Sequence, residues 1–253
     1  MATTHTLYEL DVRLRDIAPP IWRTLEVPGR ATLEDVHFAI QLAMGWNNSH
    51  LHQFVIGKVT YGMTDVDEFE KLEDERAHAL QDVAKAGATF VYEYDFGDGW
   101  EHDITVKRVA TAAKAVRPRC VAGARACPPD DCGGPGGYEQ LLAALADPDH
   151  EDHARMKEWV PARFAPERFT APARDLTRAI QELRELADGD DDEADDHDLI
   201  ASLPQDLVNS ALALAPMQRA SLVALLAGSL ATDLTTVVSM LDKARVSRGH
   251  RRS

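Results

Sequence analysis

Histidine and carboxylate side chains recur in this chain at positions that could together bind a divalent metal ion. Such ligands around an open coordination position can generate a hydroxide nucleophile from water, which is the chemistry of a metal-dependent hydrolase or nuclease. His50 and His52 are two residues apart on a predicted strand, so both could face one ion. Packing of these two rings against neighbouring aromatic side chains is the alternative. The candidate ligands are His50, His52, Asp95, Asp98, His102 and Asp131.

The three cysteines offer a second set of metal ligands. Cys120, Cys127 and Cys132 have the spacing C-x6-C-x4-C in a segment rich in proline and glycine. Their thiolates, completed by a histidine such as His102 or His50, could hold zinc in a tetrahedral site. Because no C-x2-C pair is present, small buried thiols are the competing interpretation. A catalytic thiol is not favoured, since no histidine is close in sequence to any of the three.

The densest run of aromatic and acidic residues, at positions 90–107, predicts a β-hairpin. Large apolar side chains alternate with polar ones on both sides of Gly97-Asp98-Gly99. A three-residue turn at these positions places every large apolar residue on one face, whereas a two-residue turn would mix the faces. We include Tyr94 and Trp100 among the candidate binding residues. The pairs expected from this register are Phe96 with Trp100, Tyr94 with His102, and Tyr92 with Ile104.

The other face of this hairpin concentrates negative charge. In the predicted register Asp95 lies opposite Glu101 and Glu93 lies opposite Asp103, and like charges that face each other directly destabilise a sheet. A counter-charge is therefore expected. It could be a bound divalent cation or an arginine of a neighbouring strand. The candidate arginines are Arg13, Arg15 and Arg23.

A glycine-rich segment, residues 133–137, leads into a predicted helix that begins at Tyr138. The backbone N–H groups of this segment could bind an anion at the start of the helix. A plain turn is the alternative. Gly133, Gly134 and Tyr138 complete the set of candidate binding residues.

The elements around these candidates predict an α+β fold. A two-layer domain is expected over residues 1–187, with a mixed or antiparallel sheet covered by helices on one face. The first helix should open with a capping box formed by Thr32 and Asp35 and close at Gly45, whereas residues 116–138 should be largely irregular. Besides the hairpin, the predicted strands are residues 8–14, 21–27, 50–56 and 58–62, and the predicted helices are residues 33–44, 76–86, 138–146, 151–160 and 175–187.

The remainder of the chain differs in composition. Residues 188–198 are strongly acidic, which predicts a flexible linker. Residues 199–253 predict a small helical module with a basic tail. This module could mediate self-association, bind a protein partner or bind DNA.

Bulk properties restrict the functional classes. The formal net charge of −15 argues against nucleic-acid binding by the main domain, because phosphate contacts depend on Lys and Arg. Neither a signal peptide nor an apolar run long enough to span a membrane is expected. Three cysteines, an odd number, fit a reducing compartment better than a disulfide framework, so we expect a cytoplasmic protein.

Several motifs between residues 5 and 170 together resemble the plasmid pRiA4b ORF-3-like family. The resemblance implies an α+β fold and occurrence on plasmids and insertion elements, where some members carry a resolvase label. Asp130 stands where the family pattern usually has Glu, which keeps a carboxylate but shortens its reach. The motifs are Pro20-Ile21-Trp22-Arg23, His50-Leu51-His52-Gln53-Phe54, the hairpin from Tyr92 to His102, and the run from Pro128 through Gly134 to Tyr138.

These observations support three functional hypotheses. The first is a non-catalytic binding or accessory protein of a mobile element, with zinc or another divalent cation as a structural or regulatory ligand. It is favoured because no phosphate-binding glycine loop follows a strand and no nucleophile and base stand at a recognised spacing. The second is a metal-dependent hydrolase or nuclease that uses the histidines and carboxylates above. The third is a DNA-binding accessory protein that acts through the C-terminal helices.

Overall fold

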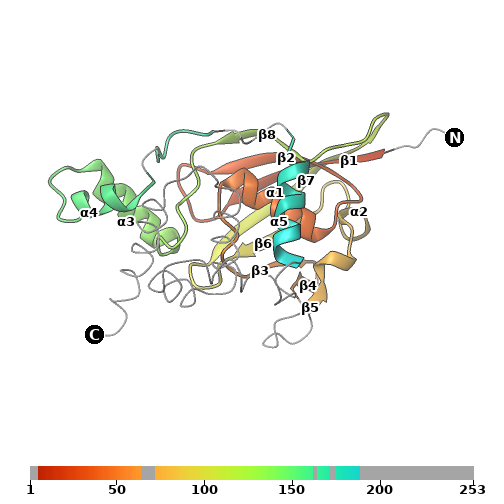
Figure 1. Cartoon of the computed structure of the whole chain (residues 1–253), viewed down its shortest axis with the longest axis horizontal. Coiled ribbons are helices and arrows are strands. Elements are labelled where there is room, and N and C mark those ends of the chain that lie inside the picture. Colours follow the sequence, from red (N-terminus) through yellow and green to blue (C-terminus); the bar gives the residue numbers. More distant parts are fainter. Residues whose placement is uncertain (1–4, 64–71, 162–163, 171, 173–174, 189–253) are drawn as a thin grey trace, which may run out of the picture. The chain divides into compact units, whose positions relative to one another are not determined.

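The predicted α+β fold is confirmed: the described residues form an eight-stranded mixed sheet with helices (Figure 1). The computed structural model describes residues 5–63, 72–161, 164–170, 172 and 175–188. The strand order is β5-β4-β3-β6-β7-β1-β2-β8, and all neighbours are antiparallel except the parallel pair β4 and β5. The strands are β1 (His5–Leu14), β2 (Trp22–Pro28), β3 (His52–Ile56), β4 (Val59–Gly62), β5 (Leu72–Asp74), β6 (Thr89–Tyr94), β7 (Trp100–Ala112) and β8 (Arg119–Ala124).

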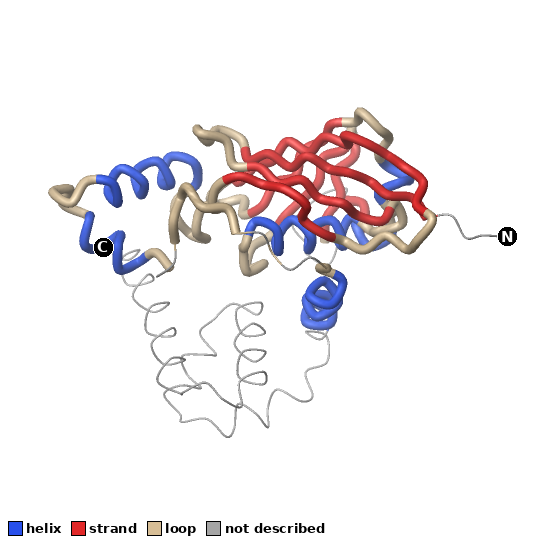
Figure 2. The backbone as a smooth tube through the Cα atoms, turned by 90° about the horizontal axis from the view of Figure 1, so that it is seen from above, coloured by secondary structure: helices blue, strands red, loops and turns tan. Residues whose placement is uncertain are grey.

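Within the described part of the first compact unit, Met1–Ile180, helices lie on one face of the sheet and past one of its ends (Figure 2). Figure 2 shows α1 against a face of the sheet, and α3 and α4 past its end. The helical segments are α1 (Leu33–Met44), the short 3-10 turn η1 (Glu75–Ala77), α2 (Leu80–Val83), α3 (Gly134–Ala146), α4 (His153–Trp159) and α5 (Thr177–Asp188). Within the described residues, no helix combines the length and the apolar composition that a membrane crossing would need.

Both β1 and α1 form as their sequence patterns predict. The alternate residues of β1 from Tyr8 to Leu14 are all buried in the core. Thr32 and Asp35 form the predicted capping box at the start of α1, and Gly45 ends the helix in the left-handed conformation at φ 93°. The apolar stripe of α1 packs on the sheet and positions the segment that follows it, residues 46–51.

The hairpin forms, but its predicted register is wrong by two residues. Tyr94 pairs with Trp100, Tyr92 with His102 and Phe90 with Ile104, so residues 95–99 form the turn. The apolar residues still share a face, because a shift of two preserves the alternation. Asp95 explains the difference: it leaves the strand with φ 55°, and its Oδ1 accepts hydrogen bonds from the N–H groups of Gly97 and Asp98 at 3.0 and 3.3 Å.

An arginine neutralises the acidic face of the hairpin, as expected. Arg15 forms ion pairs with both Glu101 and Asp103. The predicted opposition of Asp95 to Glu101 is wrong, because Glu93 faces Glu101 instead. Glu93 accepts a hydrogen bond from Gln53 at 2.7 Å.

The other two candidate arginines have different roles. Arg13 lies 3.8 Å from Asp11, in an ion pair on its own strand. Arg23 is buried and donates hydrogen bonds to the carbonyl oxygens of Ala43, Trp22 and Ala124. Neither side chain neutralises the acidic face of the hairpin.

Several predicted boundaries need correction. The helix expected at 76–86 is a 3-10 turn followed by the single turn α2, and the segment expected to be irregular contains β8. The strand expected at 50–56 begins only at His52. The chain divides into two compact units, Met1–Ile180 and Gln181–Ser253, and the predicted domain bounds 1–187, 188–198 and 199–253 stay a prediction. The predicted helices at 199–253 lie outside the described residues.

Candidate cation site

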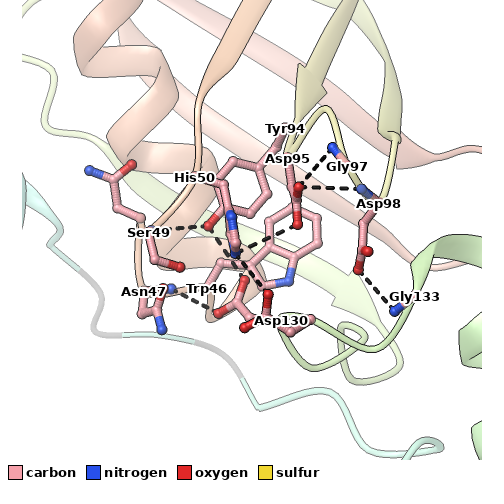
Figure 3. Close-up of polar contacts among 12 residues, drawn as sticks. Trp46, Asn47, Ser49, His50, Tyr94, Asp95, Gly97, Asp98, Asp130 and Gly133 are labelled. Atoms are coloured by element: carbon pink, nitrogen blue, oxygen red, sulfur yellow. Dashed lines mark hydrogen bonds and ion pairs between the residues drawn. The ribbon is translucent and has the colours of Figure 1, made fainter. Parts of the chain in front are cut away.

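Three loops bring His50, Asp95 and Asp131 together, and we call these three residues the cation site. Nε2 of His50 lies 3.6 Å from Oδ2 of Asp95 and 3.4 Å from Oδ1 of Asp131 (Figure 3). One ligating atom from each side chain lies within 4.8 Å of the others, and this is the only such group of three or more in the part of the chain that the structure describes. One imidazole and two carboxylates are suitable ligands for a divalent cation.

The loop that carries His50 is attached to the other two loops. The indole N–H of Trp46 donates to the carbonyl oxygen of Pro128 at 3.0 Å, and the Trp46 ring stacks on Tyr94 with centroids 4.8 Å apart. The backbone N–H of Ser49 donates to the hydroxyl oxygen of Tyr94 at 3.2 Å. These contacts hold residues 46–50 between the hairpin and the segment around Pro128.

Asp95 presents one carboxylate oxygen to the site and uses the other in its own turn. Oδ1 accepts the two turn hydrogen bonds, which leaves Oδ2 directed at His50. The side chain is only 10% exposed, whereas that of Asp131 is 71% exposed. The site is therefore enclosed on the side of Asp95 and open to solvent on the side of Asp131.

Asp130 lies beside the site and forms part of its wall. Its carboxylate accepts hydrogen bonds from the Asn47 N–H and the Tyr94 hydroxyl, each at 3.4 Å. Burial raises the pKa of Asp130 to about 6 and raises the pKa of Tyr94 well above its usual value. Asp130 was not among the candidate residues predicted from the sequence, where it stood out only as a departure from the family pattern.

Of the two alternatives for His50 and His52, packing describes His52, and the two side chains do not lie together. His52 lies on β3 and contacts both carboxylate oxygens of Glu75 through Nε2, at 3.0 and 2.9 Å. Its ring stacks on that of His37 with centroids 3.4 Å apart. Because His50 precedes the strand, it does not share the face of His52. Burial lowers the pKa of His52 to about 3.

The structure places Asp98 and His102 outside the cation site. Oδ2 of Asp98 accepts a hydrogen bond from the Gly133 N–H at 3.0 Å. His102 is fully buried under Trp46, and its Nδ1 lies 3.2 Å from the carbonyl oxygen of Tyr92, to which it donates. The mixed histidine and aspartate site is thus reduced to three residues.

The thiolate site expected from the sequence is not assembled. Among the described residues, no group of three or more ligating side chains includes Cys120, Cys127, Cys132 or His102. Burial raises the pKa of Cys120, raises that of Cys127 well above its usual value, and raises that of Cys132 to about 12. Cys120 and Cys127 are buried and Cys132 is half-buried, which favours the alternative of small protonated thiols.

The glycines before Tyr138 allow close packing, because they form the first turn of α3 at the hairpin tip. A Cβ on Gly134 would lie 2.3 Å from the carbonyl oxygen of Asp98, and one on Gly137 would lie 2.0 Å from that of Cys132. The Gly133 N–H already donates to Asp98. The side chain of Tyr138 is buried. Close approach to a neighbouring backbone therefore accounts for Gly134 and Gly137 without a bound anion.

The fold and the loop cluster describe an α+β protein with a three-loop site at one end of a mixed sheet. The chain belongs to the plasmid pRiA4b ORF-3-like protein family, whose model matches residues 6–173, so the resemblance noted in the sequence is confirmed. The matched range contains His50, Asp95 and Asp131.

Two similar proteins agree with this assignment. The uncharacterized protein y4hQ of Sinorhizobium fredii (strain NBRC 101917 / NGR234) is 40% identical over 156 residues, which cover 61% of this chain and 80% of that protein. The crystal structure of the protein of unknown function MM3350 from Methanosarcina mazei Go1 matches with a TM-score of 0.61 and 35% identity, over 66% of this chain and 97% of that chain. Neither name specifies a ligand or a reaction.

Proposed function

We propose that this protein is a divalent-cation-binding accessory protein that holds its ion with His50, Asp95 and Asp131. The observation that carries the proposal is the position of the His50 Nε2 atom. It is buried, has no hydrogen-bond partner, and lies between two carboxylates at 3.4 and 3.6 Å. A buried imidazole nitrogen is usually hydrogen-bonded, and a cation between these three groups would satisfy all of them.

The ligand types limit the choice of ion. Imidazole favours zinc, iron, nickel or copper over calcium and magnesium, whereas the two carboxylates also suit manganese. Three protein ligands leave at least one coordination position for water or an exogenous group. An ion at this point would join residues 46–51, the hairpin turn and the segment around Asp131, which come from three distant parts of the sequence.

Replacing a ligand should abolish tight binding. Chelator-treated protein should bind one equivalent of Zn²⁺ or Mn²⁺ in a calorimetric titration, and His50→Ala or Asp95→Asn should weaken the affinity by at least about 100-fold, more than loss of an outer partner costs. His150→Ala is the matched control, because it removes a histidine outside the site. Equal affinity in His50→Ala and the control, or no binding by the natural protein, would refute the proposal.

A metal-dependent hydrolase is the second candidate, because the exposure of Asp131 opens the site to solvent. An ion held by these residues would supply an activated water, and the exposed side of the site is where a substrate could approach. Hydrolysis of bis(p-nitrophenyl) phosphate and p-nitrophenyl acetate, measured with each metal, tests this function. Turnover that disappears in Asp95→Asn would support it, whereas stoichiometric metal binding without turnover would support the accessory role.

A further inference from the structure

A closed ring of hydrogen bonds lies directly behind the loop that carries His50. The N–H of Asn48 donates to Gln41 Oε1 at 3.2 Å, and Gln41 Nε2 donates to the Tyr92 hydroxyl at 2.9 Å. The Tyr92 hydroxyl lies 2.8 Å from His37 Nδ1, and His37 Nε2 lies 2.7 Å from Asn48 Oδ1. The ring therefore begins and ends on Asn48.

The Asn48 N–H, the Asn48 side-chain oxygen and the neutral His37 imidazole together set the directions of the hydrogen bonds in this ring. The Asn48 N–H can only donate, so Gln41 must present its oxygen to Asn48 and its NH₂ group to Tyr92. Nε2 of His37 faces Asn48 Oδ1, which can only accept, so Nε2 carries a proton and donates it. Burial holds the pKa of His37 well below its usual value, so the imidazole is neutral and its Nδ1 is an acceptor. The Tyr92 hydroxyl therefore accepts from Gln41 and donates to Nδ1 of His37.

Three of the four members of the ring are buried, whereas Asn48 is half-buried. His37, Gln41 and Tyr92 are each at most 1% exposed. Loss of the Tyr92 hydroxyl would therefore leave polar atoms of His37 and Gln41 unsatisfied in the core, where solvent cannot replace it. The ring thus holds Asn48 in one position relative to α1 and β6.

Asn48 transmits this constraint to the site. Its backbone has φ 58°, a left-handed conformation that asparagine tolerates better than most residues but that still costs more than in glycine. Two residues later the chain presents His50 to Asp95 and Asp131. The ring holds Asn48 through His37 and Gln41. The next residue is held separately, because the Ser49 N–H donates a hydrogen bond to the Tyr94 hydroxyl.

We infer that His37, Gln41 and Tyr92 are positioning residues for the cation site, which they preorganise by fixing Asn48 and hence the direction of His50. This inference rests on the proposed function, because it concerns affinity for the ion. A preorganised ligand binds more tightly than one that must be ordered on binding. Removing the ring should therefore weaken metal binding even though none of its members touches the ion.

Tyr92→Phe is the sharpest test, because it removes one hydroxyl and keeps the aromatic ring. We expect its Zn²⁺ or Mn²⁺ dissociation constant to rise about 10-fold or more, the usual effect of losing a supporting partner. Val12→Ala, a buried change on β1, is the control for destabilisation alone: it should lower the thermal midpoint and leave the dissociation constant unchanged. An unchanged constant in Tyr92→Phe, or an equal rise in both variants, would overturn the inference.

Asn48 provides an independent pair of variants if Tyr92→Phe does not fold. Asn48→Ala loses the acceptor and strains the backbone, whereas Asn48→Gly loses only the acceptor, so alanine should weaken metal binding more than glycine. Equal affinities in both variants and the natural protein would contradict the inference. Nitrogen NMR should find His37 neutral with its proton on Nε2, and a proton on Nδ1 would also overturn it.

The two proposals can fail separately. If the natural protein binds no metal, the proposed function fails and the positioning role fails with it. If the natural protein binds metal and the ring variants bind equally well, only the positioning role fails.

Discussion

Replacing Gly134 with alanine should lower the free energy of unfolding by roughly 3–5 kcal/mol, the sum of backbone strain and a steric overlap. Gly134 has φ +69°, where an alanine is strained, and its Cβ would lie 2.3 Å from the carbonyl oxygen of Asp98. Because that oxygen belongs to the backbone of the hairpin turn, no side-chain rotation can relieve the overlap. Either the turn or the start of α3 must move.

Neighbouring glycines in the same helical turn provide matched controls, and urea denaturation monitored by circular dichroism measures all three variants. Gly136→Ala meets nothing within 4 Å and should leave stability unchanged or raise it by about 0.5 kcal/mol, because alanine favours helix. Gly137→Ala should destabilise like Gly134→Ala, since its Cβ would lie 2.0 Å from the Cys132 carbonyl oxygen. Similar stabilities for Gly134→Ala and Gly136→Ala would show that the hairpin and α3 are not in this contact.

The Gly134 contact also links the fold to the proposed site. Asp98 and Asp95 belong to the same five-residue turn, and the turn hydrogen bonds set the direction of the Asp95 carboxylate. A displacement of the turn in Gly134→Ala should therefore also weaken metal binding. Residues that no ion touches can in this way affect a site through the backbone that carries its ligands.

Local sequence patterns were sufficient to predict an element where the pattern of buried residues follows from that element's own sequence. The alternation in β1 and the cap and stripe of α1 predicted both elements, and α1 has the predicted bounds. The hairpin register could not be predicted in the same way, because alternation of period two is unchanged by a shift of two residues. The correct register depends on Asp95, whose carboxylate forms a turn that ends the strand early.

The candidate site was predicted only in part, because its geometry depends on contacts between distant segments. His50, Asp95 and Asp131 were all named, but nothing in the sequence separated them from His52, which instead pairs with Glu75. Asn48 was missed. Asparagine tolerates the left-handed conformation, and this is the signal that could have indicated a special role in the turn after α1.

Replacing His102 with leucine should remove a loss of folding free energy, on the order of 3 kcal/mol, that the natural protein suffers between pH 6.5 and pH 4. The loss arises because burial lowers the pKa of His102 to about 4 from an ordinary 6.5. In the folded protein the imidazole stays neutral under Trp46, whereas in the unfolded chain it gains a proton below pH 6.5. The natural protein therefore loses stability from this group as the pH falls from about 6.5 to about 4. Leucine has a similar volume and binds no proton, so the variant escapes this loss.

The difference in free energy of unfolding between the natural protein and His102→Leu reports on His102 alone, because the other buried titratable groups are present in both. Glu75, whose pKa burial raises to about 7, opposes the trend, since its folded form gains a proton as the pH falls through 7. That contribution is present in both proteins and cancels. Urea denaturation should be measured between pH 7.5 and pH 4.5. Below pH 6.5 the free energy of unfolding of the variant should rise relative to that of the natural protein as the pH falls. Parallel stability profiles would mean that His102 can take up its proton without unfolding, which its enclosure between Trp46 and Tyr92 opposes.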